Sequence, residues 1–257
     1  MNKMLEQRNL VIVNVGANTA HRGLISPLWE NGEFFFVPIP DDDIPNLPTY
    51  KEILKSQIKP YVREKYLTQR VHDDPEFKTF TYGDNPETTG IGRAANIKRL
   101  VEGDLLFFFA GLTAVNSDNP INNYRFYFIG FFEISAILRN VTKTPTDEEL
   151  KLFGQNVHIT RGLFDQAEFN KFWIWKGSNN SKLFNKAVLF DRELGAKILF
   201  SRLLTPYTWP KDQSEIKLLG QRARASRLLT DNKGKRILLK QVLNTGNDVP
   251  LFTYLLE

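Results

Sequence analysis

Two aromatic-rich runs constrain the fold of this 257-residue chain more than any other feature. Their sequences are LLFFFAGL at residues 105–112 and YRFYFIGFFEI at residues 124–134. Aromatic residues favour β-strands, and both runs have the length of a strand rather than the roughly 20 apolar residues of a membrane-spanning helix. We therefore expect both runs to be core strands, with most of their phenylalanines packed in the interior.

Further strand and helix patterns flank these runs. Apolar segments predict strands at residues 9–15, 33–39, 172–176 and 187–190. Helical patterns lie at residues 49–66, where Pro60 is expected to break the helix, at 93–101, and at 146–152, where the Thr-Asp-Glu-Glu signature of a capping box begins the helix. From about residue 215 we expect a basic helical pair or a helix with a terminal strand. The sequence therefore predicts one α+β domain, residues 1–257, around a curved mixed sheet or a closed β-barrel with flanking helices. Its motif-bearing core spans about 9–135, and a basic C-terminal segment spans about 201–257.

The cysteine and histidine content limits the chemistry. The chain has no cysteine, which excludes disulfides, thiolate zinc sites and cysteine nucleophiles. Its three histidines are scattered along the sequence, which argues against an all-histidine metal site. No cofactor is evident and no metal ligand is assigned, but any metal would be held mainly by oxygen atoms, which favours Mg²⁺ or Mn²⁺.

The N-terminal residues lack the apolar core and cleavage site of a signal peptide. Together with the absence of a membrane-length apolar run, this predicts a cytoplasmic protein without membrane contacts. No sequence pattern specifies an oligomeric state.

Positive charge is concentrated near the C-terminus. Residues 201–240 contain ten basic and three acidic residues, a local balance of +7 against +5 for the whole chain. A basic surface attracts polyanions, so we expect this segment to contact nucleic acid, with Arg222, Arg224 and Arg227 as candidate ligands. The alternative is an ordinary solvated helix face.

The stretch RVHDDPEFKTFTYGD at residues 70–84 is a candidate site because so many titratable groups lie so close together. His72 can act as an acid or a base near neutral pH. Asp74 can orient that imidazole or bind a metal, and Tyr82 can donate to a base edge or stack on it. In the alternative interpretation the stretch is a solvated loop that begins a turn at Asp74.

Two further loops carry candidate binding residues. The loop GANTAHRG follows the first strand directly, where sites are often built, and contributes Asn18, His21 and Arg22. The stretch GIGRAA at residues 90–95 has the outline of a dinucleotide fingerprint, but no strand precedes it, which excludes that function. Its backbone N–H groups and Arg93 can still meet a phosphate or carboxylate at a helix start.

The segment FWIWKGS at residues 172–178 places Trp173 and Trp175 on one face of a predicted strand, with Ile174 on the other. Core packing explains such residues in most proteins. A paired tryptophan face beside basic and amide groups is also how proteins hold a flipped base, so both tryptophans are candidate base-binding residues.

The order of several short motifs resembles a known family. ISPLWENGEFFFVPIPDDD, TYKEI, VHDDPEF, YGDNPETTGIGRAANIKRLVEGDLLFFFAG and FYFIGFFEI follow one another between residues 25 and 134. This pattern is similar to the third of the nucleotide-modification-associated domain families, and the resemblance implies an association with modified nucleotides or DNA. The last two segments are also similar to the closing strands of PUA-like barrels, which include readers of modified bases.

These observations leave several functions open. The first is a nucleic-acid- or nucleotide-directed protein that takes part in DNA base modification or recognises modified bases, with DNA or a nucleotide as its partner. The second is an enzyme that hydrolyses a glycosidic or phosphodiester bond with His72 and Asp74, and the third is a non-catalytic accessory protein. For each function that uses a site at these residues, we expect His72, Asp74 and Arg93 to converge on one cleft, with residues 18–22 on its rim.

Overall fold

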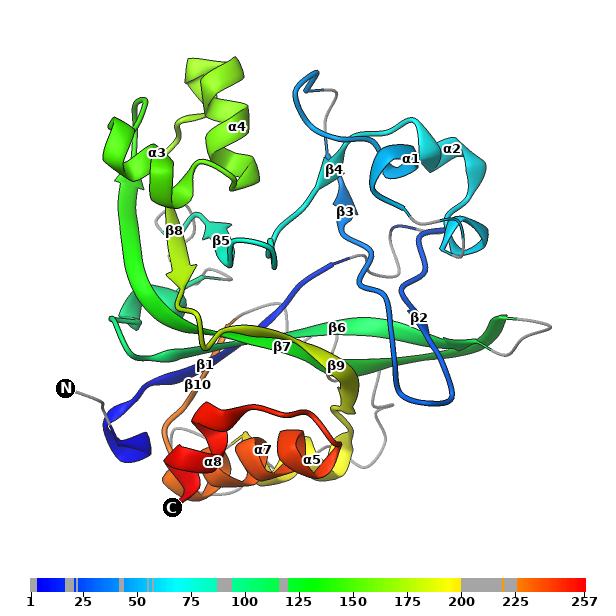
Figure 1. Ribbon diagram of the computed structural model, residues 1–257, viewed down its shortest axis with the longest axis vertical. Helices are drawn as coiled ribbons and strands as arrows, with labels where there is room; N and C mark the ends of the chain where they lie inside the picture. Colours follow the sequence, from blue (N-terminus) through cyan, green and yellow to red (C-terminus); the bar gives the residue numbers. More distant parts are fainter. Residues whose placement is uncertain are drawn as a thin grey trace.

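The computed structural model describes residues 4–16, 21, 23–41, 44–54, 56, 58–86, 94–115, 120–199, 219 and 226–257, without the side chains of 120–123. A long curved sheet runs through the molecule, with helices on both sides (Figure 1). Its strands are β1 (Leu10–Asn14), β2 (Pro27–Leu28), β5 (Thr81–Asp84), β6 (Leu105–Val115), β7 (Pro120–Val141), β8 (Phe172–Gly177), β9 (Lys182–Leu189) and β10 (Arg227–Leu229). A second, two-stranded sheet contains β3 (Ile39–Pro40) and β4 (Val71–His72).

The helices are short. The α-helices are α1 (Tyr50–Ile53), α2 (Glu64–Leu67), α3 (Asp147–Phe153), α4 (Val157–Phe164), α5 (Arg192–Ile198), α7 (Asn232–Asn244) and α8 (Pro250–Leu256). Single 3₁₀ turns lie at Leu5–Gln7, Lys59–Tyr61, Ile97–Arg99 and Gln166–Glu168. Within the described ranges, every helix is too short or too polar to cross a bilayer.

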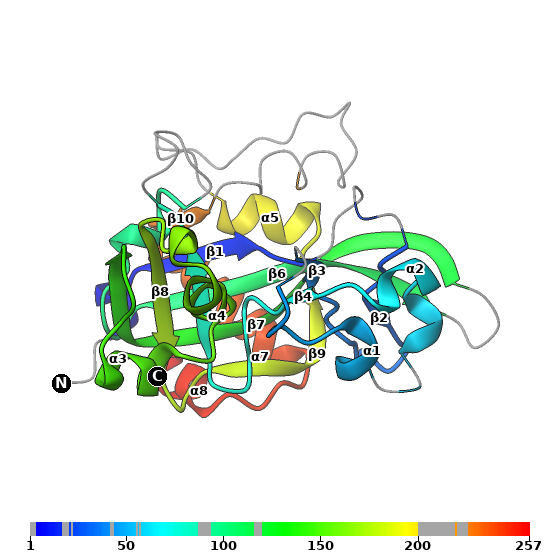
Figure 2. The same cartoon turned by 90° about the horizontal axis from the view of Figure 1, so that it is seen from above.

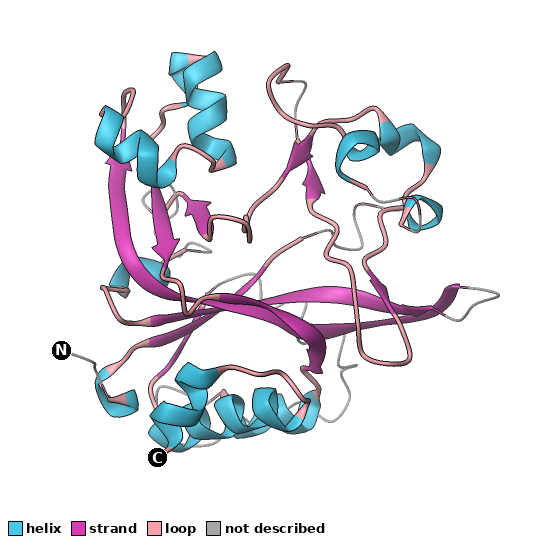
Figure 3. Ribbon diagram, viewed as in Figure 1, coloured by secondary structure: helices cyan, strands magenta, loops and turns pink. Residues whose placement is uncertain are grey.

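The two aromatic-rich runs form the centre of the sheet, as predicted. β6 pairs antiparallel with β7 from Leu105 opposite Glu133 to Val115 opposite Pro120. β7 is 22 residues long, and beyond Ile134 it leaves β6 and pairs with β8 instead. Irregular pairing between Ile134 and Ala136 accompanies this change of partner. Because one strand belongs to two parts of the sheet, the sheet bends strongly along β7 (Figure 3).

The sheet is mixed and open, and its strands follow the order β10-β1-β6-β7-β8-β5. β1 runs parallel to β6 and antiparallel to β10. In the part of the chain that the structure describes, the terminal strands β10 and β5 do not pair with one another. The predicted α+β domain with a curved mixed sheet and flanking helices is therefore confirmed, whereas the closed, PUA-like barrel is not.

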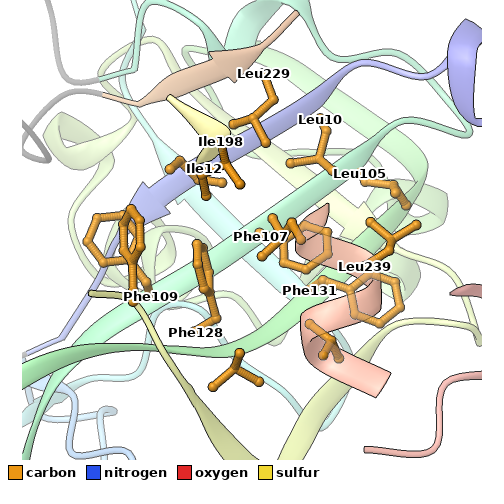
Figure 4. Close-up of a cluster of buried hydrophobic side chains, with 14 of the residues drawn as sticks. Leu10, Ile12, Leu105, Phe107, Phe109, Phe128, Phe131, Ile198, Leu229 and Leu239 are labelled. Atoms are coloured by element: carbon orange, nitrogen blue, oxygen red, sulfur yellow. The ribbon is translucent and has the colours of Figure 1, made fainter. Parts of the chain in front are cut away.

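Both faces of β6 are buried. Phe107 and Phe109 belong to a core that α7 and α8 cover, whereas Leu106 and Phe108 point to the opposite face. Phe107 stacks on Phe252 of α8 with ring centroids 5.5 Å apart. Figure 4 shows this cluster of phenylalanine and leucine side chains between the sheet and the helices. Because both faces of β6 are buried, its sequence is continuously apolar instead of alternating between apolar and polar residues.

Several local predictions are confirmed. The side-chain oxygen of Thr146 accepts a hydrogen bond from Glu149 N at 3.3 Å, so a capping box begins α3 as expected. α7 and α8 form the predicted C-terminal helical pair and pack against the sheet beside α5 (Figure 1).

Three predicted elements are shorter than expected. The break expected at Pro60 in the helix at residues 49–66 is confirmed, since a 3₁₀ turn containing Pro60 separates α1 from α2, but α1 is shorter than expected and ends at Ile53. The strand expected at 33–39 is reduced to an isolated bridge at Phe34 and to β3, since Pro38 and Pro40 have no N–H to donate. The described part of the expected helix at 93–101 contains only the 3₁₀ turn Ile97–Arg99.

Two groups of elements stand on the face of the sheet opposite α7 and α8. The first contains the β3–β4 sheet, α1 and α2, around a small core that includes Val37, Tyr50 and Val71. α3 and α4 pack beside β8 around Phe153, Ile159 and other apolar residues. Figure 1 shows both groups above the sheet, with β5 between them, and Figure 2 shows the two groups from above, on either side of the molecule.

A buried ion pair ties the N-terminus to the bend in β7. Arg8 donates to Glu133 Oε1 at 2.6 Å, and Ser178 and Asn180 each donate to Glu133 Oε2 at 2.7 Å. Burial alone would raise the pKa of Glu133, but these hydrogen bonds outweigh it and hold the pKa below its usual value.

We expect Glu133→Gln to lower the free energy of unfolding by about 2 kcal/mol at neutral pH, because charge-assisted hydrogen bonds are lost. A carboxyl whose pKa is lowered in the folded state stabilises it above the unfolded pKa, and this contribution disappears as pH falls through the folded pKa. Urea unfolding of both proteins across acidic and neutral pH measures the difference. A difference that stays constant with pH would contradict this role of the charge.

Candidate functional site

A cavity of about 410 Å³ opens between the two groups of elements above the sheet. Its volume lies within the roughly 300–1,000 Å³ of small-molecule sites. The lining comes from β1, β3, β4, β5 and α4, elements that are far apart in sequence (Figure 1). The lining residues are Asn14, Gly16, His21, Ile39, His72, Asp74, Tyr82, Gly83, Asp84 and His158.

His72 is held in one orientation by a buried carboxylate. It ends β4, where it lies opposite Ile39 of β3. Its Nδ1 is 2.8 Å from Asp41 Oδ2, and the Asp41 side chain is only 2% exposed. Because a carboxylate only accepts, Nδ1 carries the proton, and Nε2 is the atom left to react or to bind.

Arg161 of α4 holds the same carboxylate from its other side. It donates to Asp41 Oδ1 at 2.9 Å and to the more exposed Glu168 at 2.7 Å. A buried carboxylate needs such partners, since an isolated buried charge is very costly. Asp41, and through it His72, is thereby tied to α4.

Asp74 is the carboxylate of the cavity wall, and two donors position it. Its Oδ1 accepts the backbone N–H of Gly83 at 2.9 Å and the side-chain amide of Asn156 at 3.2 Å. Asn156 is fully buried and also caps α4, where its Oδ1 accepts from His158 N at 3.1 Å. One asparagine therefore sets both the start of α4 and the position of Asp74.

His158 lies in the first turn of α4 and points into the cavity. Its Nε2 is 3.7 Å from Asp74 Oδ2, and its ring meets that of His72 edge to face with centroids 5.0 Å apart. Phe172 packs against it, with ring centroids 5.3 Å apart. His72, Asp74 and His158 each offer one nitrogen or oxygen atom, and these three atoms all lie within 4.8 Å of one another. We call these three residues the imidazole–carboxylate cluster.

Gly83 is required by the close approach of α4 to β5. A Cβ atom at this position would lie 2.3 Å from His158 Cδ2 and 3.0 Å from Asn156 Oδ1. Contacts below 3.0 Å do not persist, so a side chain here would displace the imidazole. The glycine in the Tyr82-Gly83-Asp84 strand thus makes room for His158.

The remaining polar lining surrounds the cluster. The Tyr82 ring is buried in the core, and its hydroxyl donates to Asp84 Oδ2 at 2.9 Å. Burial lowers the pKa of His21. Burial, with smaller contributions from Glu76 and Asp74, raises the pKa of Asp73 to about 6. The cluster therefore has further hydrogen-bonding groups beside it in the cavity.

The predicted site residues divide into three groups. His21, His72, Asp74 and Tyr82 line the cavity together. Asn18, Arg22, Arg93, Arg222 and Arg224 lie outside the described residues, so convergence of Arg93 on the cleft stays a prediction. Trp173, Trp175 and Arg227 are described and are not among the lining residues.

Trp173 and Trp175 do share one face of β8, opposite Ile174, as expected. Trp175 is fully buried, however, and packs in the core beside Tyr82 with ring centroids 6.2 Å apart. A ring without exposed surface cannot stack on a base, so this placement favours the core role for Trp175. Trp173 is partly buried, and Arg139 lies 5.4 Å over its ring.

Sequence reasoning missed Asp41, Asn156, His158 and Arg161. The signal available was NVHITR at residues 156–161, an N-cap residue followed by a histidine and an arginine three apart on one helix face. The scattered histidines argued only against an all-histidine metal site, and that expectation stays a prediction. Scatter along the sequence does not keep His72 and His158 apart, because the fold brings their rings together with centroids 5.0 Å apart.

Comparisons with known proteins identify the family. The model of the family "Nucleotide modification associated domain 3" matches residues 9–231, and this chain belongs to that family. No curated protein matches the chain. A similar solved structure is the N-terminal domain of Thermococcus gammatolerans McrB bound to m5C DNA, with 11% identity, a TM-score of 0.32, and coverage of 92% of this chain and 99% of that one. A TM-score of this size does not establish a shared fold.

Proposed function

We propose that this protein is an enzyme of DNA base modification that acts on a nucleobase or nucleotide bound in the cavity. Membership of the nucleotide-modification family supports the class of ligand. The observation that carries the proposal is the imidazole–carboxylate cluster, three reactive side chains brought into one cavity from β4, its following loop and α4. Such groups serve general acid–base catalysis, and hydrolysis of a glycosidic or phosphodiester bond is the reaction that we propose for them.

The cavity also offers groups that suit the edge of a base. Asn14, Tyr82 and Asp84 combine an amide, a hydroxyl and a carboxylate around the cluster. A mixed set of donors and acceptors is what hydrogen-bonding recognition of a base requires. The polar lining therefore supports a base-bearing ligand.

The same lining favours catalysis over recognition alone. A reader of modified bases holds its ligand in an aromatic cage and needs no acid–base groups. Trp175 is fully buried, whereas two imidazoles and a carboxylate face the cavity. We therefore place the reader function second.

A steric block tests whether the cavity is the binding site. Ile39 lines it and is partly exposed, so a larger side chain there extends into the cavity rather than into the core. We expect Ile39→Trp to weaken binding of deoxynucleoside monophosphates by at least about tenfold, or about 1.4 kcal/mol. Calorimetry with bases, nucleosides and monophosphates measures this loss, with Ile39→Val as the control that leaves the cavity open. Equal affinities for the two variants, or no binding by the native protein, would refute the site.

The basic segment at residues 201–240 suggests that the substrate base is presented within DNA. Its local balance is +7, and Arg227 is exposed on β10. We expect DNA binding to weaken steeply with salt, because neutralised phosphates release counterions. Charge reversal at Arg222, Arg224 and Arg227 should lower both the affinity and the salt slope. A triple variant with native affinity and slope would remove this surface from consideration.

A further inference from the structure

The imidazole–carboxylate cluster has the donor set of a metal centre. His158 Nε2 is 3.7 Å from Asp74 Oδ2. This is close to the roughly 3.3 Å between ligand atoms that bind one ion tetrahedrally at about 2.0–2.1 Å. All three residues line the cavity, so an ion held by them keeps positions open for water or substrate.

The relative orientation of the two imidazoles fits a shared ion. The ring centroids of His72 and His158 are 5.0 Å apart, with an angle of 85° between the ring planes. Two imidazoles that bind one ion at about 2.1 Å, with a roughly tetrahedral angle between the bonds, have centroids roughly 5 Å apart. The ring pair therefore already has the spacing of two ligands of one ion.

The surroundings supply the outer hydrogen bonds that metal ligands need. Asp41 accepts from His72 Nδ1 at 2.8 Å and so directs Nε2 of His72 away from itself. This carboxylate–histidine arrangement is the usual support of a metal-bound imidazole. Arg161 fixes Asp41 in turn, with a contact of 2.9 Å.

Asp74 is supported in the same way. Its Oδ1 accepts the hydrogen bond from the Asn156 side chain. The Gly83 N–H is shared between the two carboxylate oxygens, and its nitrogen is closer to Oδ1, at 2.9 Å, than to Oδ2, at 3.2 Å. Oδ2 is the atom that faces His158. The carboxylate thus presents its less engaged oxygen to the two imidazoles.

We propose that the cluster binds one divalent first-row transition-metal ion, of which Zn²⁺, Fe²⁺ and Mn²⁺ are the candidates. A catalytic role of this ion rests on the proposed function, whereas the proposal that the ion binds rests on the side-chain geometry alone. Two imidazoles and one carboxylate suit these ions, whereas Mg²⁺ prefers oxygen ligands. The proposed site therefore combines nitrogen and oxygen ligands, whereas the sequence alone led us to expect mainly oxygen ligands.

Equilibrium dialysis of the full-length protein, first stripped with a chelator, tests the proposal. We expect the native protein to retain about one Zn²⁺ or Co²⁺ ion per chain in the presence of excess Mg²⁺, and bound Co²⁺ to show the intense absorption of a tetrahedral site. Metal should also raise the unfolding temperature, because it binds only the folded state. Failure to retain a stoichiometric ion would overturn the proposal.

Variants assign the ion to the cluster. Stoichiometric binding should be lost in His72→Ala and His158→Ala, and Asp41→Asn should weaken it by about 10–100-fold through the outer hydrogen bond alone. His21→Ala is the matched control, since this histidine lines the cavity without belonging to the cluster. Binding that survives in the folded His72→Ala/His158→Ala double variant, or that His21→Ala removes equally, would contradict the assignment. Asp41→Asn serves as the decisive variant if the alanine variants do not fold.

The metal titration contains no nucleotide, and the nucleotide titration is repeated on the stripped protein. A protein that binds metal but no nucleotide would overturn the proposed function and leave the metal site standing. Nucleotide binding without stoichiometric metal would overturn the metal site and leave the proposed function standing.

Discussion

Gly83→Ala should leave the sheet intact and reduce turnover in the cavity about 100-fold. The new Cβ atom would lie 2.3 Å from His158 Cδ2 and 3.0 Å from its Nε2, so the imidazole must move by about an ångström. Misplacing a reacting group by that distance typically costs about 100-fold in rate. Gly83 has an ordinary backbone conformation, so alanine introduces the clash without backbone strain.

A double-mutant cycle separates this clash from a general loss of stability. We expect Gly83→Ala alone to lower the free energy of unfolding by about 1–3 kcal/mol through overpacking. Most of that cost should vanish in a His158→Ala background, where the atoms that clash are absent. Chemical denaturation of the four proteins gives the coupling energy. The same cost in both backgrounds would show that His158 does not occupy the space above Gly83.

Arg161→Ala is expected to destabilise the protein by about 3 kcal/mol, although Arg161 lies on a short surface helix. Its guanidinium pairs with the Asp41 carboxylate, whose side chain is 2% exposed. Removing one partner of a buried ion pair is costly because the other charge stays buried. His72 is hydrogen-bonded to the same carboxylate, so its orientation should loosen as well.

Glu168→Gln provides the matched control for this prediction. Glu168 is the other carboxylate that Arg161 contacts, and its side chain is 36% exposed. Exposed ion pairs contribute little, so the change should stay below about 1 kcal/mol. Urea unfolding of both variants at neutral pH makes the comparison. Similar losses for the two variants would mean that burial of Asp41 is not what makes Arg161 important.

Much of the fold follows from local sequence. The runs at 105–112 and 124–134 are long, apolar and aromatic, and they became β6 and the centre of β7. A capping box placed the start of α3 within one residue. The interruption at Pro60 was also predictable, whereas the lengths of the elements were not: α1 ends at Ile53, and the strand expected at 33–39 contains only a bridge at Phe34 and the start of β3.

The site was predictable only where its residues are close in sequence. His72, Asp74 and Tyr82 were found because they share one short stretch. The contacts of Asp41 and His158 with that stretch depend on the path of β3 and on the docking of α4, which no local pattern encodes. For Trp175 the sequence left core packing and base binding open, and its full burial favours core packing.

Mass spectrometry of DNA and nucleotide pools incubated with the protein tests the central claim most directly. The native protein, supplied with a divalent transition metal, should change the mass of at least one base or nucleotide. Folded His158→Ala should leave the same pools unchanged, because it removes one member of the cluster in the cavity. Pools that the native protein leaves intact, or that both proteins change equally, would contradict an enzyme working through this site.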